Sequence, residues 1–348
     1  MKPTCFHGRA AASIENEQLR VTVLEEGGHI AEILDKRTGI NPLWIPPWPS
    51  LEPSAYGPTV HALYGANSEG KLLAGIMGHN LCLDLFGGPS EEEAAAGVTV
   101  HGEGSVVRYE IGEADGGLLM QARFPLAQIA FARRIALRGP SVRIRESVEN
   151  LAAWDRPLGW TQHVTLGPPF LEAGVTQFHA PATRSLTFDG EFGIAAYLCP
   201  AAEFDWPLAP RRDGGMADLR VMDGAAASSA YTAHLMGAPG TRAFFAAFSP
   251  AAQLVFGYVW KTDDFPWMGI WEENHSRVHA PWNGRTLARG MEFGVSPFPE
   301  SRRAMVERGT LFGAPAYRWL AAGARIDVEY WAVTAKAESI PKHLFVVD

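Results

Sequence analysis

Three short segments of the chain each carry one acid or base among small or aromatic residues. His101 lies in Val-His-Gly-Glu-Gly (residues 100–104), His163 in Gly-Trp-Thr-Gln-His-Val (159–164), and Glu292 in Arg-Gly-Met-Glu-Phe-Gly (289–294). Imidazole and carboxylate groups can be tuned to exchange protons near neutral pH, so this set suits general acid–base catalysis. Because the segments are far apart in sequence, only a large fold could bring them together.

Glu292 is notable because its neighbours are apolar. Met291 and Phe293 flank it, and Val295 follows after Gly294. Burial of a carboxylate costs free energy unless the charge is paired or used. A strand residue that faces solvent is the other interpretation of Glu292.

Aromatic and polar residues near these segments suggest a carbohydrate as ligand. The chain has 11 tryptophans, and an indole ring can pack on the C–H face of a sugar while polar groups bind its hydroxyls. Core filling is the alternative for each tryptophan. Glu103 either binds a hydroxyl or pairs with an arginine, and Asn80 follows a pocket-edge turn at Gly78. The predicted binding residues are Asn80, Glu103, Trp160, Trp271, Glu272, Asn274 and Trp282.

The elements that must position these residues are strands. Apolar side chains alternate with polar ones in the segments 19–23, 142–149 and 326–330, a period of two that marks half-buried strands. Only residues 91–96 and 302–309 suggest short helices. Runs of strands without alternating helices predict an all-β sandwich or barrel. We expect one domain over residues 1–348.

Composition excludes several classes of protein. The formal net charge is -8, which disfavours nucleic acid as a partner because phosphate binding needs a basic surface. No apolar run approaches the ~18 residues of a membrane span, and the N-terminus lacks an apolar signal region. We therefore expect a cytoplasmic protein without a membrane partner. Oligomeric state cannot be inferred.

Motifs for metals and cofactors are absent or weak. His275 and His279 are four residues apart, but Pro281 and the strand-like context argue against the helix that would place them on one face, and no glutamate follows His275 as in a zinc-protease motif. No phosphate-binding glycine loop or serine-hydrolase elbow is found. Three cysteines without a Cys-x-x-Cys pair predict no disulfide framework. We expect neither a metal nor a cofactor.

The three segments, in this order, resemble the galactose mutarotase (aldose 1-epimerase) family. Glu292 is similar to the family's late Gly-hydrophobic-Glu segment, His163 to its central histidine before a Pro/Gly/Phe loop, and His101 to its His-Gly pair. The resemblance implies a large antiparallel β-sandwich, called a supersandwich, and interconversion of sugar anomers without a cofactor. It assigns Glu292 as base, His163 as acid and His101 as a donor that orients the sugar.

The chain departs from the family at several positions, as an outlying member would. Glu103 stands where a second glycine is frequent, and the family's sugar-binding aspartate and arginine have no clear counterpart, Asp263 and Asp264 being the nearest candidates. Two other functions stay open. One is a non-catalytic carbohydrate-binding protein on the same fold. The other is a lyase or glycoside hydrolase, which would need a second carboxylate such as Glu272 or Glu273 near Glu292.

Overall fold

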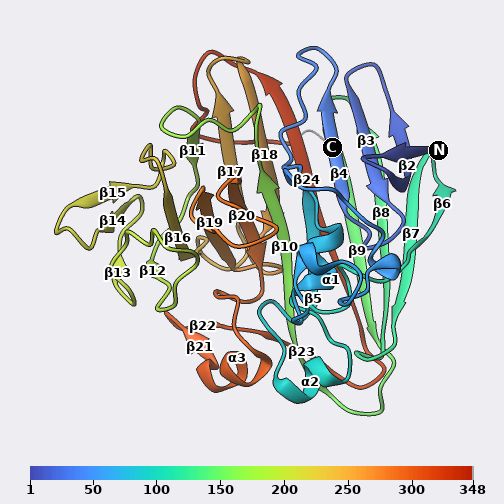
Figure 1. The fold of residues 1–348 in the computed structure, drawn as a ribbon. Coiled ribbons are helices and arrows are strands. Elements are labelled where there is room, and N and C mark those ends of the chain that lie inside the picture. The colour runs from blue at the N-terminus through green and yellow to red at the C-terminus, as the bar shows by residue number, and fades with distance from the viewer. Residues whose placement is uncertain (347–348) are drawn as a thin grey trace.

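Two large antiparallel sheets form the molecule in a computed structural model that describes residues 1–346 (Figure 1). The larger sheet follows the order β1-β2-β3-β4-β5-β10-β20-β19-β16-β12-β13, and β23 pairs with β10 beside this path. Its strands are β1 (Lys2–Phe6), β2 (Arg9–Glu15), β3 (Leu19–Leu24), β4 (Ile30–Asp35), β5 (His79–Asp84), β10 (Arg156–Leu166), β12 (Ser185–Thr187), β13 (Glu203–Phe204), β16 (Ser228–Leu235), β19 (Trp267–Asn274), β20 (Leu287–Gly294) and β23 (Arg318–Leu320).

The second sheet has the order β11-β17-β18-β24-β9-β8-β7-β6. Its strands are β6 (Glu110–Ala114), β7 (Gly117–Phe124), β8 (Ile129–Arg138), β9 (Ser141–Asn150), β11 (Gln177–His179), β17 (Arg242–Ser249), β18 (Leu254–Lys261) and β24 (Arg325–Lys336). Two small ribbons join β14 (Leu208–Pro210) to β15 (Met216–Asp218), and β21 (Thr310–Leu311) to β22 (Ala314–Pro315). This architecture confirms the predicted all-β antiparallel sandwich.

Helices are few and short. They are α1 (Gly70–Gly75), α2 (Glu91–Ala95) and α3 (Arg302–Arg308), with 3-10 turns at Pro53–Ala55 and Ala62–Tyr64. Two of them lie where the sequence predicts them, and a serine caps each: Ser90 accepts from the Glu93 N–H before α2, and Ser301 from the Ala304 N–H before α3. Both lie at the lower end of the molecule in Figure 1.

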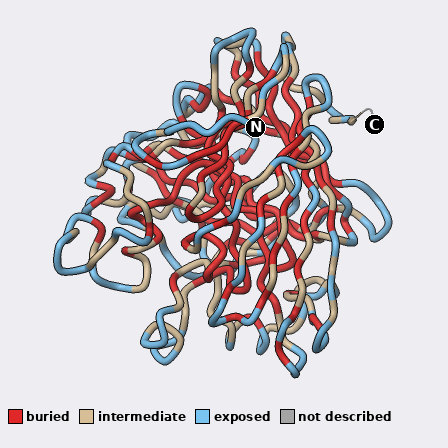
Figure 2. The backbone as a smooth tube through the Cα atoms, turned by 90° about the vertical axis from the view of Figure 1, so that its right-hand side faces the viewer, coloured by how far each residue is buried: buried red, intermediate tan, exposed pale blue. Residues whose placement is uncertain are grey.

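The main hydrophobic core lies between the two sheets, where Figure 2 shows a continuous buried interior. Val21, Leu83 and Phe293 of the larger sheet and Ile144 and Phe256 of the second sheet belong to this core. A second cluster of buried aromatic and aliphatic residues includes Trp44, Trp48, Phe86, Trp271 and Trp282. The larger sheet therefore buries apolar residues on both faces. Its inner face packs against the second sheet, and its outer face carries the second cluster.

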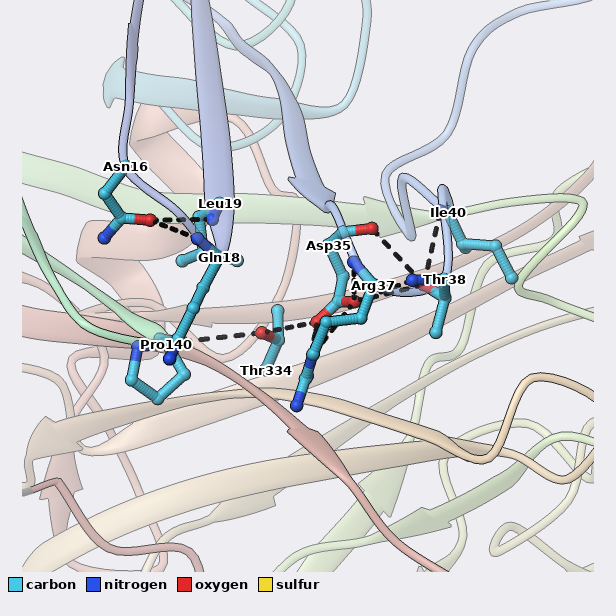
Figure 3. A network of polar contacts seen from close by, with 9 residues as sticks. All are labelled: Asn16, Gln18, Leu19, Asp35, Arg37, Thr38, Ile40, Pro140 and Thr334. Carbon is cyan, nitrogen blue, oxygen red and sulfur yellow. Dashed lines mark hydrogen bonds and ion pairs between the residues drawn. The ribbon is translucent and has the colours of Figure 1, made fainter.

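A buried carboxylate fastens the two sheets together near one edge. Asp35, at the end of β4, accepts a hydrogen bond from the Thr334 hydroxyl of β24 at 3.1 Å, and from the backbone N–H groups of Arg37 and Thr38 at 3.1 Å each (Figure 3). Burial raises the pKa of Asp35, but the bonds from Arg37 and Thr38 outweigh burial, so the net pKa is lowered. The carboxylate therefore stays ionised while it links the sheets.

A second buried carboxylate, Glu146 of β9, organises the middle of the sandwich. Its Oε1 accepts from Arg133 Nε and from the Tyr330 hydroxyl, both at 2.7 Å. Its Oε2 accepts from Trp160 Nε1 at 3.2 Å and from Gln162 Nε2 at 2.6 Å. Trp160 and Gln162 belong to β10, so one carboxylate joins strands of both sheets and fixes which face of β10 points inward.

Loss of the Arg133 charge should therefore destabilise the whole sandwich. Both side chains of the Arg133–Glu146 pair have 0% exposure, and removal of one partner from a buried pair costs about 3–5 kcal/mol because the other charge is left unpaired. We expect Arg133→Met to lower the free energy of unfolding by about that amount in urea titrations. The control Arg303→Met removes an exposed pair with Glu307 and should change it little. Equal losses in the two variants would contradict this role.

Candidate functional site

A cavity of about 370 Å³ opens on the outer face of the larger sheet, over strands β10, β16, β19 and β20. This size falls within the range of small-molecule sites. Five of the residues predicted from sequence line it: His101, His163, Trp271, Trp282 and Glu292. The fold thus brings together the three acid–base residues that lie far apart in the sequence.

His163 and Glu292 are neighbours because of strand register. His163 of β10 pairs directly with Glu292 of β20, and residues directly opposite each other in an antiparallel pair share one face of the sheet. His163 Nε2 lies 3.1 Å from Glu292 Oε1. The two atoms are not aligned as a hydrogen bond, and Oε1 has no hydrogen-bond partner within residues 1–346. The pair is therefore close enough to exchange protons with one bound group.

Glycines leave room for the Glu292 carboxylate. A Cβ atom at Gly290, two residues earlier on the same face, would lie 2.2 Å from Glu292 Oε1. Gly269, directly opposite Glu292 on β19, leaves space for the Tyr231 hydroxyl, which a Cβ would meet at 2.0 Å. The glycines around Glu292 in the sequence thus have a steric cause.

His101 reaches the cavity from a tight turn. Its φ of 68° lies in the left-handed region, and Gly102 follows at φ 73°. A Cβ at Gly102 would lie 2.5 Å from the Leu83 carbonyl oxygen, so only glycine fits there. The His101 ring centroid is 5.0 Å from that of His163. Backbone strain of this kind is concentrated at functional sites.

The hydrogen bond of His101 changes the role expected for it. Nδ1 lies 2.5 Å from the Phe86 carbonyl oxygen, which can only accept, so Nδ1 carries the proton. Burial lowers the pKa of His101 to about 4, so the ring is neutral at pH 7 and Nε2 is an acceptor. His101 Nε2 is thus able to accept a hydrogen bond from a group in the cavity, whereas the resemblance implied a donor.

Burial shifts the two facing acid–base groups in opposite directions. It raises the pKa of Glu292 well above the usual range of a glutamate. Burial, followed by the nearby His101, lowers the pKa of His163 well below its usual value. Desolvation disfavours the charged form of each group. Between the two shifted pKa values the pair therefore holds one proton between its two members.

Aromatic rings and one cation line the cavity beside this pair. Trp282 packs against Trp48 with ring centroids 4.9 Å apart, and Trp271 lies 5.9 Å from His163. The Arg277 guanidinium lies over the Trp282 ring at 4.4 Å and over Trp271 at 5.4 Å. Sugar-binding sites combine such apolar rings with a few polar groups.

Five residues predicted as sugar ligands do not line the cavity. Three of them, Trp160, Glu272 and Asn274, lie on the inner face of the sheet, because the side chains of a strand alternate between its faces. Trp160 donates a hydrogen bond to Glu146, and Asn274 donates one to the Ala225 carbonyl. Glu272 accepts one from the Tyr197 hydroxyl. Glu103 turns away beyond Gly102 and accepts from the Ala127 N–H. Asn80 of β5 lies opposite His163 in the strand pairing, but its side-chain amide donates a hydrogen bond to the Ser105 hydroxyl.

Several other residues that line the cavity were not predicted from the sequence. Arg277, Glu69, Phe192 and Tyr231 all line the cavity, and they come from loops or strands without a motif. Asp263 and Asp264, the nearest candidates for a sugar-binding aspartate, lie elsewhere, beside another hollow near Pro266. Only a fold could show that the Arg277 loop returns over the tryptophans.

Two absences concern metal sites and membrane-spanning helices in the described residues. Among residues 1–346 no group of three or more histidine, cysteine, aspartate or glutamate side chains is arranged to bind a metal ion. No helix in that range is long and apolar enough to cross a membrane.

The raised pKa of Glu292 predicts a stability effect of known sign. An acid whose folded pKa is raised contributes most favourably below its unfolded pKa, and this contribution is lost as pH rises through the folded pKa. We expect Glu292→Gln to match the wild type in stability near pH 4 and to exceed it at pH 7. The gain grows by about 1.4 kcal/mol for each pH unit above the unfolded pKa until the folded pKa is reached. A gain that does not depend on pH, in urea titrations at both values, would contradict the shift.

Comparison with known proteins gives structural matches alone. Neither models of protein families nor curated proteins match the sequence. A Klebsiella pneumoniae protein, described provisionally as an aldose 1-epimerase, superposes with a TM-score of 0.67 at 15% identity over 95% of this chain and 80% of its own. A galactose mutarotase-like protein from Clostridium acetobutylicum gives 0.62 at 12% over 96% and 98%, and one from Lactobacillus casei gives 0.55 at 12% over 93% and 100%. The chain has the galactose mutarotase-like fold.

Proposed function

We propose that the protein interconverts the anomers of a free aldose or a closely related sugar by acid–base catalysis without a cofactor. The observation that carries this proposal is the facing pair, His163 Nε2 at 3.1 Å from Glu292 Oε1, in a cavity walled by tryptophans. The solved structures with this fold include proteins described as galactose mutarotase-like, which supports a sugar as substrate.

Ring opening requires two proton transfers. Glu292 takes the proton of the anomeric hydroxyl, the carbonyl bond forms at C1, and the bond from C1 to the ring oxygen breaks. His163 gives its proton to the ring oxygen. After rotation about the C1–C2 bond the same steps run backwards and close the ring on the other face. No proton is gained or lost overall, because each group ends as it began.

Burial assists both transfers. With these shifts the pair carries its single proton on Glu292 at rest. The reactive form carries that proton on His163, with Glu292 ionised, and ring opening leaves both groups neutral. Desolvation raises the pKa of Glu292 and lowers that of His163, which makes the carboxylate a stronger base and the imidazolium a stronger acid. His101 Nε2 accepts a sugar hydroxyl and fixes the ring relative to the pair.

The structure bears on the alternative functions too. A glycoside hydrolase needs two carboxyl groups on either side of the scissile bond. Glu272 is committed to Tyr197, and Glu273 accepts from the Ser276 and Arg277 N–H groups. Neither lines the cavity. The partners that the sequence offered for Glu292 are thus otherwise engaged, and no specific contact favours a binding protein over an enzyme.

Glu292→Gln should slow anomer exchange by a factor of about 100 or more, since a positioned acid–base group contributes roughly 10²–10⁴-fold. Exchange is measured by saturation-transfer NMR on a panel of free aldoses, and circular dichroism checks the fold. Full activity in the variant would refute the assignment. Saturable binding of a sugar by the wild type without faster exchange would support a binding protein instead.

The pH dependence of kcat/KM should show a broad plateau across neutral pH. The active form holds one proton on the pair, and a second proton binds only well below the ordinary histidine pKa of 6.5, because His163 is shifted down. The last proton leaves only well above the ordinary glutamate pKa of 4.5, because Glu292 is shifted up. The two limbs report the pair as a unit. A narrow optimum, or an acid limb near pH 6.5, would contradict the shifts.

Gly290→Ala should reduce exchange about tenfold or more, because its Cβ would displace the Glu292 carboxylate from His163. The control is Gly112→Ala in β6, where a Cβ would meet nothing within 4 Å. Equal rates for the two variants, measured in the same NMR assay, would show that the carboxylate position is not critical.

A further inference from the structure

Arg277 occupies an unusual position at the cavity. Its guanidinium lies against three rings, those of Trp282, Trp271 and Phe192, at 4.4, 5.4 and 5.4 Å. It lies 3.5 Å from Glu273 and 3.7 Å from Glu69, too far for the 2.7–2.9 Å bonds usual between an arginine and a carboxylate. Within residues 1–346 its side chain donates no hydrogen bond. The rings therefore hold a cation whose donors are unused.

Glu69 is the complementary acceptor beside Arg277. It stands at the N-cap of α1, but its side chain makes no capping bond, and its carboxylate accepts no hydrogen bond from any residue that the structure describes. Its side chain is 29% exposed. Glu273, by contrast, is 1% exposed and is fixed by two backbone N–H groups. Glu273 holds Arg277 in place, and Glu69 remains available to a ligand.

Two buried donors lie behind the same wall. The indole N–H groups of Trp271 and Trp282 are buried and have no acceptor in the described part of the chain. A buried donor without a partner costs about 1–3 kcal/mol. Both tryptophans line the cavity beside Arg277. The rings thus offer the cavity apolar surface, whereas their N–H groups are shielded.

The combination selects for hydroxyl groups over anions. A hydroxyl both donates and accepts, so it can receive a bond from Arg277 and give one to Glu69. A carboxylate or phosphate only accepts, and it would meet the Glu69 and Glu273 charges that already balance the guanidinium. Glu191 also lines the cavity, although it pairs with Arg212. The charge around Arg277 is thus unfavourable for an anionic sugar.

We propose that Arg277 and Glu69 are a donor–acceptor pair that positions the ring hydroxyls of the sugar, and that Glu69 excludes sugars bearing a carboxylate or a phosphate. This inference rests on the proposed function for its substrate, a monosaccharide. Arg277 is a positioning residue, because the proton transfers belong to Glu292 and His163.

The test compares D-galactose and D-glucose with D-glucuronate and D-glucose 6-phosphate in two assays: anomer exchange by NMR, and equilibrium titration followed by tryptophan fluorescence. We expect the wild type to prefer the neutral sugars. Arg277→Gln should raise KM about tenfold or more, the usual effect of losing a hydrogen bond to a charged group, with a smaller change in kcat. Arg277→Lys should restore part of the loss.

Glu69→Gln should shift selectivity toward the anionic sugars by about fivefold or more, because one countercharge of Arg277 is lost. The matched controls are Arg285→Gln, an exposed arginine in the same hairpin, and Glu91→Gln, an exposed glutamate at the start of α2. Neither control should change KM or selectivity.

The outcomes separate this inference from the proposed function. Preference of the wild type for an anionic sugar, or an unchanged KM in Arg277→Gln, would overturn the inference while exchange itself could persist. Selective titration with neutral sugars and its loss in Arg277→Gln, without any exchange, would support the inference and overturn the proposed catalysis. A Glu69→Gln variant with wild-type selectivity would remove Glu69 from the account.

Discussion

The buried Glu146 carboxylate is the interaction on which the site depends. It binds Arg133 and Tyr330 within the second sheet and Trp160 and Gln162 of β10 in the larger sheet. Because strand side chains alternate, Trp160 and Gln162 can face inward only if His163 faces outward. A shift of β10 by one residue would break the hydrogen bonds from Trp160 and Gln162 to Glu146 and bury His163 in the core. The network that joins the sheets thus also sets the orientation of the central histidine.

Desolvation then sets the acid–base properties of His163 and Glu292 on the outer face of the larger sheet. His163 and Glu292 meet through strand pairing, but aromatic residues on four separate segments exclude water from them: Trp44, Phe86, Trp271 and Trp282. Burial raises the pKa of Glu292 and lowers that of His163, so that between the two shifted values the pair holds one proton, which either group can carry. A site that needs both an acid and a base at the same pH gains from this arrangement. The cost is an uncompensated carboxylate, which stability elsewhere in the sandwich must offset.

Much of the fold could be predicted from the sequence because the signals were local. Alternation in 19–23 and 142–149 predicted strands, and residues 91–96 and 302–309 suggested the two short helices that the structure contains. The residues of the site were harder to predict. Trp271, Glu272 and Asn274 were all expected to bind sugar, yet a period of two cannot place an odd and two even positions on one face. Arg277 could not be found, because no sequence pattern shows that the loop between β19 and β20 folds so that its guanidinium lies over Trp271 and Trp282.

The measurement that tests the central claim most directly is a double-mutant cycle on anomer exchange with His163→Gln, Glu292→Gln and the double variant, all in the same assay. If one shared proton pair carries the reaction, either single change removes nearly all the catalysis, and the double variant is about as slow as the slower single one. Losses that simply multiply in the double variant would show that the two groups act independently, and would contradict the account of a proton pair held by strand register.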